Sequence, residues 1–301
     1  MDRMTFPAFN TVNTVSAHEC PPEVFEEVKQ LCNRFEMLFS HTLPESDLNR
    51  VNESAGRTVE TSSELADLVG KSLRYCEATG GLFDITMGPV VSLWDFHQGT
   101  IPDAKLVESA LTHVDYRKVE VGRSSVRLAD PSARITLGGI AKGYIADAIL
   151  DLLSFRGIKH AIVNLGGNVA VIGGKPDGSP FNVGIRAPIS SKDSSETPVI
   201  SIPLMNGSLV TSGTYERCFV RDGKRYHHIL DPRTGYPAAT NLESSTIIAR
   251  SSLDADGFST APLVAGLPEA RRLIESLEGI EAVFIETGGT LSATSGVRLA
   301  Q

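Results

Sequence analysis

The spacing of hydrophobic residues along this chain predicts three long amphipathic helices. In residues 24–39, 62–78 and 144–153, apolar side chains recur every three or four positions, which is the period of a helix with one buried face. Pro21-Pro22 precedes the first segment and Gly157 follows the third. Proline is favoured at helix starts and glycine just beyond helix ends, so these residues support the proposed boundaries.

The remaining apolar segments are shorter and predict strands joined by turns. Residues 160–172 are expected to form a strand pair interrupted at Gly166-Gly167, where a glycine often permits close approach by another group. A segment rich in Gly, Pro and Ser, residues 173–199, predicts a hairpin and an exposed loop around residues 190–195. Further strands are expected at 244–249, 282–286 and 291–297, and further helices at 254–265 and 268–277.

The order of these elements favours an α+β fold with largely antiparallel sheets packed against helices. Strands and helices do not alternate regularly, and no internal repeat is present. With 301 residues, of which 41% are hydrophobic and 21% charged, the chain can bury a large core. We expect one domain over residues 1–301, with two closely packed subdomains as the alternative.

Charge and cysteine content narrow the possible partners. A net charge of −8 and the lack of a Lys/Arg cluster argue against binding to nucleic acid. The four cysteines are scattered without a Cys-x-x-Cys pair, so we expect reduced thiols and no zinc site. The sequence contains no apolar stretch of membrane-spanning length and no signal peptide at its start. A cytoplasmic location is therefore expected for the chain as written, with a trimmed, exported protein as the alternative.

Residues 226–235 contain the densest group of candidate catalytic side chains. The segment reads Tyr-His-His-Ile-Leu-Asp-Pro-Arg-Thr-Gly, and His228 is the candidate general base because imidazole titrates near neutral pH. The alternative is a simple hairpin turn, in which Asp231 caps the turn and Gly235 adopts a positive φ angle. The segment alone leaves both interpretations open.

Two other segments have the composition of a phosphate site and a metal site. In residues 135–144, a strand-like piece leads through a glycine turn into a helix that carries Lys142, an arrangement that can hold phosphate. In residues 253–261, Asp256 and Thr260 are four positions apart and would share a helix face. Their oxygens could bind Mg²⁺, although a tight turn and a helix cap are the ordinary alternatives.

These three segments, in this order, resemble the FAD:protein FMN transferase (ApbE-like) family. The resemblance extends over nearly the whole chain. It includes residues 9–11, 46–52, 79–89, 93–94, 164–168, 184–188 and 211–217.

The resemblance implies a Mg²⁺-dependent reaction with FAD as the substrate. A Ser or Thr hydroxyl of an acceptor flavoprotein would take FMN through a phosphoester bond, and AMP would leave. His228, rather than its neighbour His227, aligns with the family's base, and Asp231 would orient either His228 or the turn. The metal ligands implied are the side chains of Asp256 and Thr260 and the backbone carbonyl of Gly139.

The resemblance also implies contacts to the flavin and the nucleotide. Lys142 would contact the nucleotide, whereas Thr136 replaces an aspartate of many relatives and brings a hydroxyl without charge. Thr42 stands where some relatives have an aromatic residue, and Phe9 could pack on a ring system or in the core. The remaining implied contacts are Leu82, Phe83, Asp84 and the backbone of Ile229.

Two alternative functions remain open at this point. Water could replace the acceptor hydroxyl, which would make the protein a Mg²⁺-dependent FAD pyrophosphatase, or the chain could bind FAD without catalysis. The family modifies targets with a motif like Asp-x-x-(Ser/Thr)-Gly-Ala-Thr, and this sequence contains none. The acceptor is therefore expected to be another protein.

Overall fold

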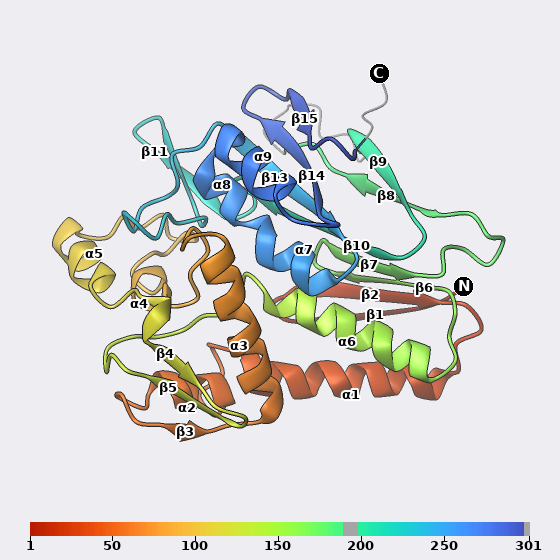
Figure 1. Ribbon diagram of the computed structural model, residues 1–301, viewed down its shortest axis with the longest axis horizontal. Helices are drawn as coiled ribbons and strands as arrows, with labels where there is room; N and C mark the ends of the chain where they lie inside the picture. Colours follow the sequence, from red (N-terminus) through yellow and green to blue (C-terminus); the bar gives the residue numbers. More distant parts are fainter. Residues whose placement is uncertain (189–197, 298–301) are drawn as a thin grey trace.

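A computed structural model describes residues 1–188 and 198–297 and shows a central eight-stranded antiparallel sheet. The strands lie in the order β1-β2-β6-β7-β10-β13-β14-β15 (Figure 1). Their bounds are β1 Asp2–Ala8, β2 Thr11–Ala17, β6 Ala161–Leu165, β7 Asn168–Ile172, β10 Gly207–Gly213, β13 Leu242–Ala249, β14 Glu281–Glu286 and β15 Leu291–Ala293.

Three smaller antiparallel sheets surround the central one. They consist of β3 Val59–Glu60 with β5 Ser125–Leu128 and β4 Val119–Val121, of β8 Phe181–Ile185 with β9 Ile200–Leu204, and of β11 Cys218–Arg221 with β12 Lys224–His227. The helices are α1 Pro22–Phe39, α2 Asp47–Asn52, α3 Ser63–Ala78, α4 Gly88–Val91, α5 Ala104–Leu111, α6 Ala141–Phe155, α7 Ser252–Ser259, α8 Ala261–Ala265, α9 Leu267–Glu275 and the short 3₁₀ helix Tyr116–Lys118.

Successive side chains of a strand point to opposite faces of the sheet, and in β7, β10, β13 and β14 both faces are buried. In β14, Ala282 and Phe284 pack into the core beneath the helices. Val283 and Ile285 of the same strand pack into a second core, which the β8–β9 hairpin helps to form. This arrangement explains why β14 is a continuous apolar run instead of an alternating one.

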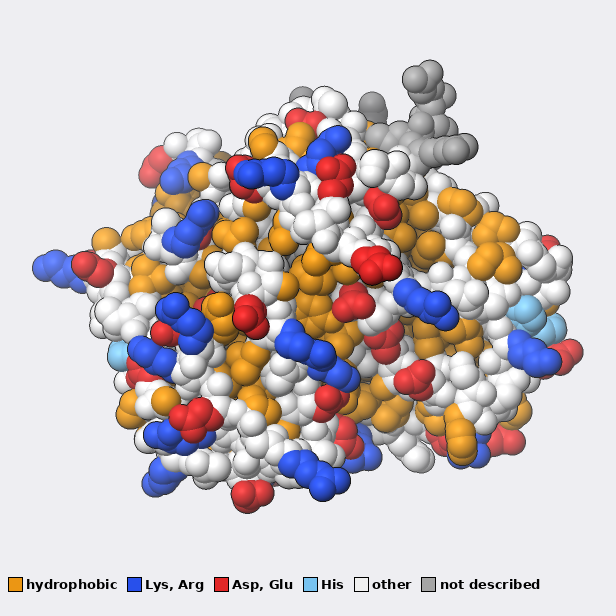
Figure 2. Space-filling model, in the orientation of Figure 1, with side chains coloured by type: hydrophobic (Ala, Val, Ile, Leu, Met, Phe, Trp, Pro, Cys, Tyr) orange, Lys and Arg blue, Asp and Glu red, His pale blue; other side chains and the backbone are white. Residues whose placement is uncertain are grey.

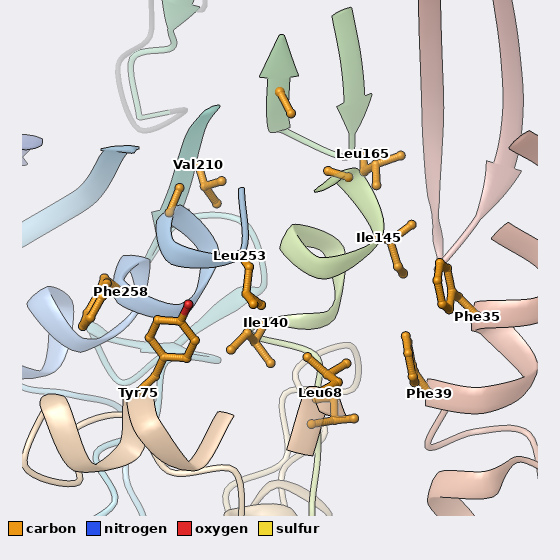
Figure 3. Close-up of a cluster of buried hydrophobic side chains, with 14 of the residues drawn as sticks. Phe35, Phe39, Leu68, Tyr75, Ile140, Ile145, Leu165, Val210, Leu253 and Phe258 are labelled. Carbon is orange, nitrogen blue, oxygen red and sulfur yellow. The ribbon is translucent and has the colours of Figure 1, made fainter. Parts of the chain in front are cut away.

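One face of the sheet is covered by a row of helices. Helix α1 packs on β1, α6 on β6 and β7, α7 on β10 and β13, and α9 on β14 (Figure 1). Figure 3 shows the centre of this core, where Ile140 at the start of α6 lies between Leu253 of α7 and Leu68 of α3. The ring of Tyr75 meets Phe258 edge-on at a centroid distance of 5.0 Å. These contacts fix α7 against α3 and α6.

Two tight turns lie at the same end of the sheet. Phe9 and Asn10 join β1 to β2 and both have positive φ, as two-residue hairpin turns of type I′ require. Gly166 and Gly167 join β6 to β7, also with positive φ. A Cβ atom at Gly166 would lie 2.7 Å from the side chain of Thr11, so only glycine fits there.

The structure confirms the α+β class and most of the expected elements, with three corrections. The helix expected at 254–265 is two helices, since α7 ends at Ser259 and α8 begins at Ala261. The strand expected at 291–297 ends at Ala293, and residues 135–137 are extended but form no strand. The exposed loop expected around residues 190–195 lies outside the described residues.

The surface shown in Figure 2 carries charges of both signs, and most of the cysteines are buried. On the face in Figure 2, basic side chains are interspersed with acidic ones and do not gather into one basic surface. Cys20, Cys32 and Cys76 are buried free thiols, and Cys218 is a half-buried one. Within residues 1–188 and 198–297, no helix is long and apolar enough to cross a membrane.

We predict that Leu68→Ala lowers the free energy of unfolding by about 2–5 kcal/mol, because it leaves a cavity in the main core. Leu68 is 0% exposed, whereas Leu106 of α5 is 55% exposed and serves as the control. Leu106→Ala should change stability by less than about 0.5 kcal/mol. Urea unfolding of both variants measures the difference, and equal losses would contradict this assignment of the core.

Candidate active site

The glycine turn before α6 leaves one backbone carbonyl free. Ile140 and Ala141 both donate their N–H groups to the carbonyl of Leu137. The N–H of Gly143, which a longer helix would direct to Gly139, instead donates to Asp256 Oδ2 at 2.8 Å. Among the described residues, no group donates a hydrogen bond to the Gly139 carbonyl oxygen. That oxygen is available to a ligand.

Helix α7 packs directly against the backbone of Gly143 in α6. A Cβ atom at this position would lie 2.4 Å from the carbonyl oxygen of Ser252 and 2.7 Å from Cβ of Asp256. Any side chain at Gly143 would therefore push α7 away from α6. The glycine keeps the Asp256 carboxylate beside the start of α6.

Asp256, Thr260 and Gly139 form a group of oxygen donors. Asp256 is 3% exposed, and its Oδ1 accepts no hydrogen bond from the described residues. The hydroxyl of Thr260, at the C-cap of α7, lies 3.4 Å from Ser212 Oγ and 3.8 Å from the position of a Cβ on Gly139. A carboxylate, a hydroxyl and a free carbonyl suit a hard cation such as Mg²⁺.

Lys142 places a positive charge at the same helix start. Its Nζ donates to the carbonyl of Gly138 at 3.3 Å, and the described residues offer it no ion pair. Burial raises the pKa of Glu216, and the charge of Lys142 partly offsets that rise. Burial lowers the pKa of His228, and the charge of Lys142 acts in the same direction. Lys142 thus links the glycine turn electrostatically to the histidine segment.

The histidine segment folds as a tight turn after the β11–β12 hairpin. The carboxylate of Asp231 pairs with the Arg233 guanidinium at 2.7 Å, and its backbone carbonyl accepts the N–H of Gly235 at 2.8 Å. Gly235 has a φ of 73°, as the turn requires. No hydrogen bond joins Asp231 to His228 in the described part of the chain. The described side-chain contacts of Asp231 thus lie within the turn, to Arg233.

Trp94 anchors this turn from a distant part of the sequence. Its Nε1–H donates to the Gly235 carbonyl at 3.0 Å, and its ring stacks on Phe96 with a centroid distance of 5.5 Å. Phe219 and Tyr226 stack across the β11–β12 hairpin and extend this aromatic cluster. The cluster fixes the strand that leads into His228.

His228 is held as a neutral imidazole. Its Nδ1 is buried without a hydrogen-bond partner among the described residues. Burial lowers the pKa of His228 to about 3, and the charges of Arg217, His227 and Lys142 act in the same direction. His227 is 6% exposed and burial also lowers its pKa. Of the two, His228 is the less buried and the better candidate to reach a substrate.

Some of the expected flavin and nucleotide contacts lie near the turn formed by Gly138 and Gly139. The ring of Phe83 lies 3.3 Å from the position of a Cβ on Gly139, and Leu82 packs against the main core. Thr136 Oγ1 is 3.8 Å from the corresponding position on Gly138. Asp84 is occupied locally, because its carboxylate accepts both the N–H and the hydroxyl of Thr86.

Other expected contacts lie around the periphery or have structural partners. Phe9 packs against the main core, and its N–H donates to Glu36 of α1. Thr42 is exposed and its hydroxyl lies 3.0 Å from Ser40 Oγ. No hydrogen bond between described residues connects Phe9 or Thr42 to the rest of the site. Ile229 is buried, and its carbonyl accepts the N–H of Ala238.

The structure adds residues to which the sequence had given no role. Ser212, near the end of β10, lies 2.8 Å from the hydroxyl of Ser259 and reaches Thr260. Arg217 accepts the His228 N–H at its backbone carbonyl, and its charge lowers the pKa of His228. In the sequence, one feature could have pointed to Ser212 and Arg217: they belong to a polar segment, residues 211–217, that directly follows apolar residues.

The comparison with known proteins covers almost the whole chain. The model of the ApbE family matches residues 9–284. An FAD:protein FMN transferase of Treponema pallidum is 36% identical over 290 residues, covering 90% of this chain and 79% of the relative. One of Klebsiella pneumoniae is 35% identical over 277 residues, covering 90% of this chain and 85% of the relative.

A solved structure shows the same fold. The crystal structure of the ApbE protein of Thermotoga maritima has a TM-score of 0.88 and 32% identity to this chain, and covers 98% of this chain and 97% of its own. The family model, the relatives and the solved structure agree over nearly the entire length. This chain belongs to the ApbE family.

Proposed function

We propose that this protein transfers FMN from FAD to a Ser or Thr hydroxyl of an acceptor flavoprotein in a Mg²⁺-dependent reaction. The observation that supports this function best is the convergence of the Gly139 carbonyl, the Asp256 carboxylate and the Thr260 hydroxyl at the start of α6. Relatives 31–36% identical over most of the chain are named FAD:protein FMN transferases.

In the proposed reaction, His228 acts as the general base. It takes the proton of the acceptor hydroxyl, whose oxygen forms a bond to the phosphorus on the FMN side of FAD. The bond from that phosphorus to the bridging pyrophosphate oxygen breaks, and AMP leaves with the bridging oxygen. The half-buried imidazole of His228 is unprotonated at neutral pH, as a base must be before it accepts a proton.

The proposed metal ligands from the protein are Asp256, Thr260 and the Gly139 carbonyl. Bound there, Mg²⁺ would neutralise charge on the pyrophosphate oxygens. Lys142 is proposed to contact a phosphate, since its ammonium group has only a carbonyl partner at 3.3 Å. Phe83, Leu82 and the Ile229 backbone are proposed to contact the flavin. Thr136, Thr42, Asp84 and Phe9 are further proposed cofactor contacts, which rest on the family resemblance.

Intact mass spectrometry tests the proposed function directly. An acceptor domain with an Asp-x-x-Thr-Gly-Ala-Thr motif is incubated with this protein, FAD and Mg²⁺, with EDTA as the control. The proposal requires a Mg²⁺-dependent mass increase equal to one FMN phosphoester on the acceptor, together with AMP. AMP and free FMN without an adduct would identify the protein as a pyrophosphatase. If FAD stays intact, the protein binds flavin without catalysing either reaction.

We predict that His228→Ala lowers the transfer rate by about 10²–10⁴-fold, the usual contribution of a general base. FAD binding, measured by quenching of flavin fluorescence, should remain close to that of the wild type. His227→Ala is the matched control and should retain more activity than His228→Ala. Near-normal transfer by His228→Ala would remove this residue from the mechanism.

We predict that Asp256→Asn lowers Mg²⁺-dependent transfer by about a hundredfold or more, since a metal ion supplies several kcal/mol to such reactions. The amide oxygen of Asn can still accept the Gly143 N–H, so the variant separates metal binding from the helix contact. Asp256→Ala, which loses both, should be less stable as well. An unchanged Mg²⁺ dependence in Asp256→Asn would exclude this carboxylate as a ligand.

We predict that the ring of His228 does not titrate between pH 5 and 8. In the folded chain the pKa of His228 is about 3, below its ordinary value. At pH values between the two, His228 is protonated in the unfolded chain and neutral in the folded one. Stability should therefore fall as pH decreases below about 6.5. Histidine ring NMR of the wild type, assigned with His228→Gln, measures this. A His228 midpoint near 6.5 would contradict the burial assigned to the ring.

A further inference from the structure

The carboxylate of Asp147 on α6 has no assigned role, yet it binds the start of α7. Its Oδ1 accepts the N–H of Ser252 at 2.7 Å, and its Oδ2 accepts the N–H of Leu253 at 3.0 Å. Oδ2 also accepts the hydroxyl of Ser251, the N-cap residue of α7, at 2.7 Å. The first N–H groups of a helix lack partners within it, and a carboxylate there also stabilises the helix dipole.

Helix α7 returns the same interaction to α6. Asp256 Oδ2 accepts the N–H of Gly143, in the first turn of α6, at 2.8 Å. Each helix therefore supplies a carboxylate to the first turn of the other. The two contacts, together with the close approach at Gly143, fix both the separation of the helices and their position along each other.

The first turn of α7 is also tied to the sheet and to α3. Ser252 donates its hydroxyl to Asn168 of β7 at 2.7 Å and accepts one from Ser208 of β10 at 3.0 Å. Tyr75 of α3 donates its hydroxyl to Asp254 at 2.5 Å. These are bonds between side chains, whereas Asp147 holds the backbone of α7 itself.

The position of this first turn determines where the proposed metal ligands lie. Asp256 follows Ser252 by one helical turn, and Thr260 follows Asp256 by another. A helix moves as a rigid unit over such a length, so a shift at its start also displaces both oxygens from the Gly139 carbonyl. We propose that Asp147 is a positioning residue that sets the Mg²⁺ affinity of the Gly139, Asp256 and Thr260 group, an inference that rests on the proposed function.

The test is Mn²⁺ binding followed by electron paramagnetic resonance, in buffer alone and with saturating FAD. Mn²⁺ accepts the same oxygen ligands as Mg²⁺. In Asp147→Asn, the amide oxygen can still accept a hydrogen bond. The NH₂ group that replaces the second oxygen is a donor, so it cannot accept from the backbone N–H groups of α7. Partners behind metal ligands typically contribute 10–100-fold to affinity, so we expect the Mn²⁺ Kd to rise by about tenfold or more. Transfer activity should recover as the metal concentration is raised.

Ser62→Ala is the matched control, because it should lower the stability of the protein without changing the position of α7. Ser62 is the N-cap of α3 and accepts the N–H of Leu65 at 3.2 Å. Its loss should lower the melting temperature and leave the Mn²⁺ Kd unchanged, because it lies on a different helix. If Asp147→Asn does not fold, Mn²⁺ binding is measured on Ser251→Ala instead. Its Mn²⁺ Kd should rise by about threefold, since this variant removes a single contact to Asp147.

The outcomes separate this inference from the proposed function. If the wild type binds Mn²⁺ and Asp147→Asn, or Ser251→Ala in its place, binds it equally well, the positioning role is wrong and the proposed metal site stands. If the wild type does not bind Mn²⁺ under either condition, the metal site and the positioning role are both wrong. A weaker Kd in the Asp147 or Ser251 variant, with Ser62→Ala unchanged, supports the inference.

Discussion

Contact between α6 and α7 controls where the candidate catalytic groups lie. A glycine at position 143 lets the helices touch, and the carboxylates of Asp147 and Asp256 then bind the first turns of opposite helices. Because Asp256 takes the N–H of Gly143, the Gly139 carbonyl loses the helical partner it would otherwise have. The same interaction that joins the helices thus creates the free oxygen beside the Asp256 carboxylate.

The central sheet gives this helix pair a rigid support. Its β7, β10, β13 and β14 strands are buried on both faces, and α6 packs on β6 and β7 while α7 packs on β10 and β13. The histidine segment is held differently, by the Trp94 aromatic cluster and by the internal hydrogen bonds of the Asp231 turn. Burial and nearby positive charge keep His228 neutral. A neutral base and a set of hard oxygens are the two requirements of the proposed transfer.

The sequence predicted the parts of this structure that depend on local patterns. Helices α1, α3 and α6 and the β6–β7 pair follow from apolar spacing and from terminal proline, serine or glycine residues. The break after Ser259 was missed although Pro262 marks it, since proline has no N–H to donate inside a continuous helix and is favoured in a first turn, where it lies in α8. The β11–β12 hairpin was missed because its strands are short and carry many charges.

The candidate site was only partly predictable for a related reason. Asp256 and Thr260 were suggested by their helical spacing and Gly139 by the resemblance, but the contact between Gly143 and Asp256 spans 113 positions and leaves no local pattern. Asp147 looked like an ordinary polar residue on an amphipathic helix, since its partners are backbone groups of a distant segment. The sequence left Asp231 open between the turn and His228, and its contact with Arg233 could not be read from the local pattern.

The oxygens at the α6–α7 contact are the proposed ligands of a divalent metal. The most direct test is a crystal grown with FAD and Mn²⁺ and measured at a wavelength where manganese scatters anomalously. We expect an anomalous peak at bonding distance, about 2.0–2.2 Å, from Asp256 Oδ1, Thr260 Oγ1 and the Gly139 carbonyl oxygen. A fully occupied FAD site with no anomalous peak at these atoms, or with the metal held by other residues, would contradict the account.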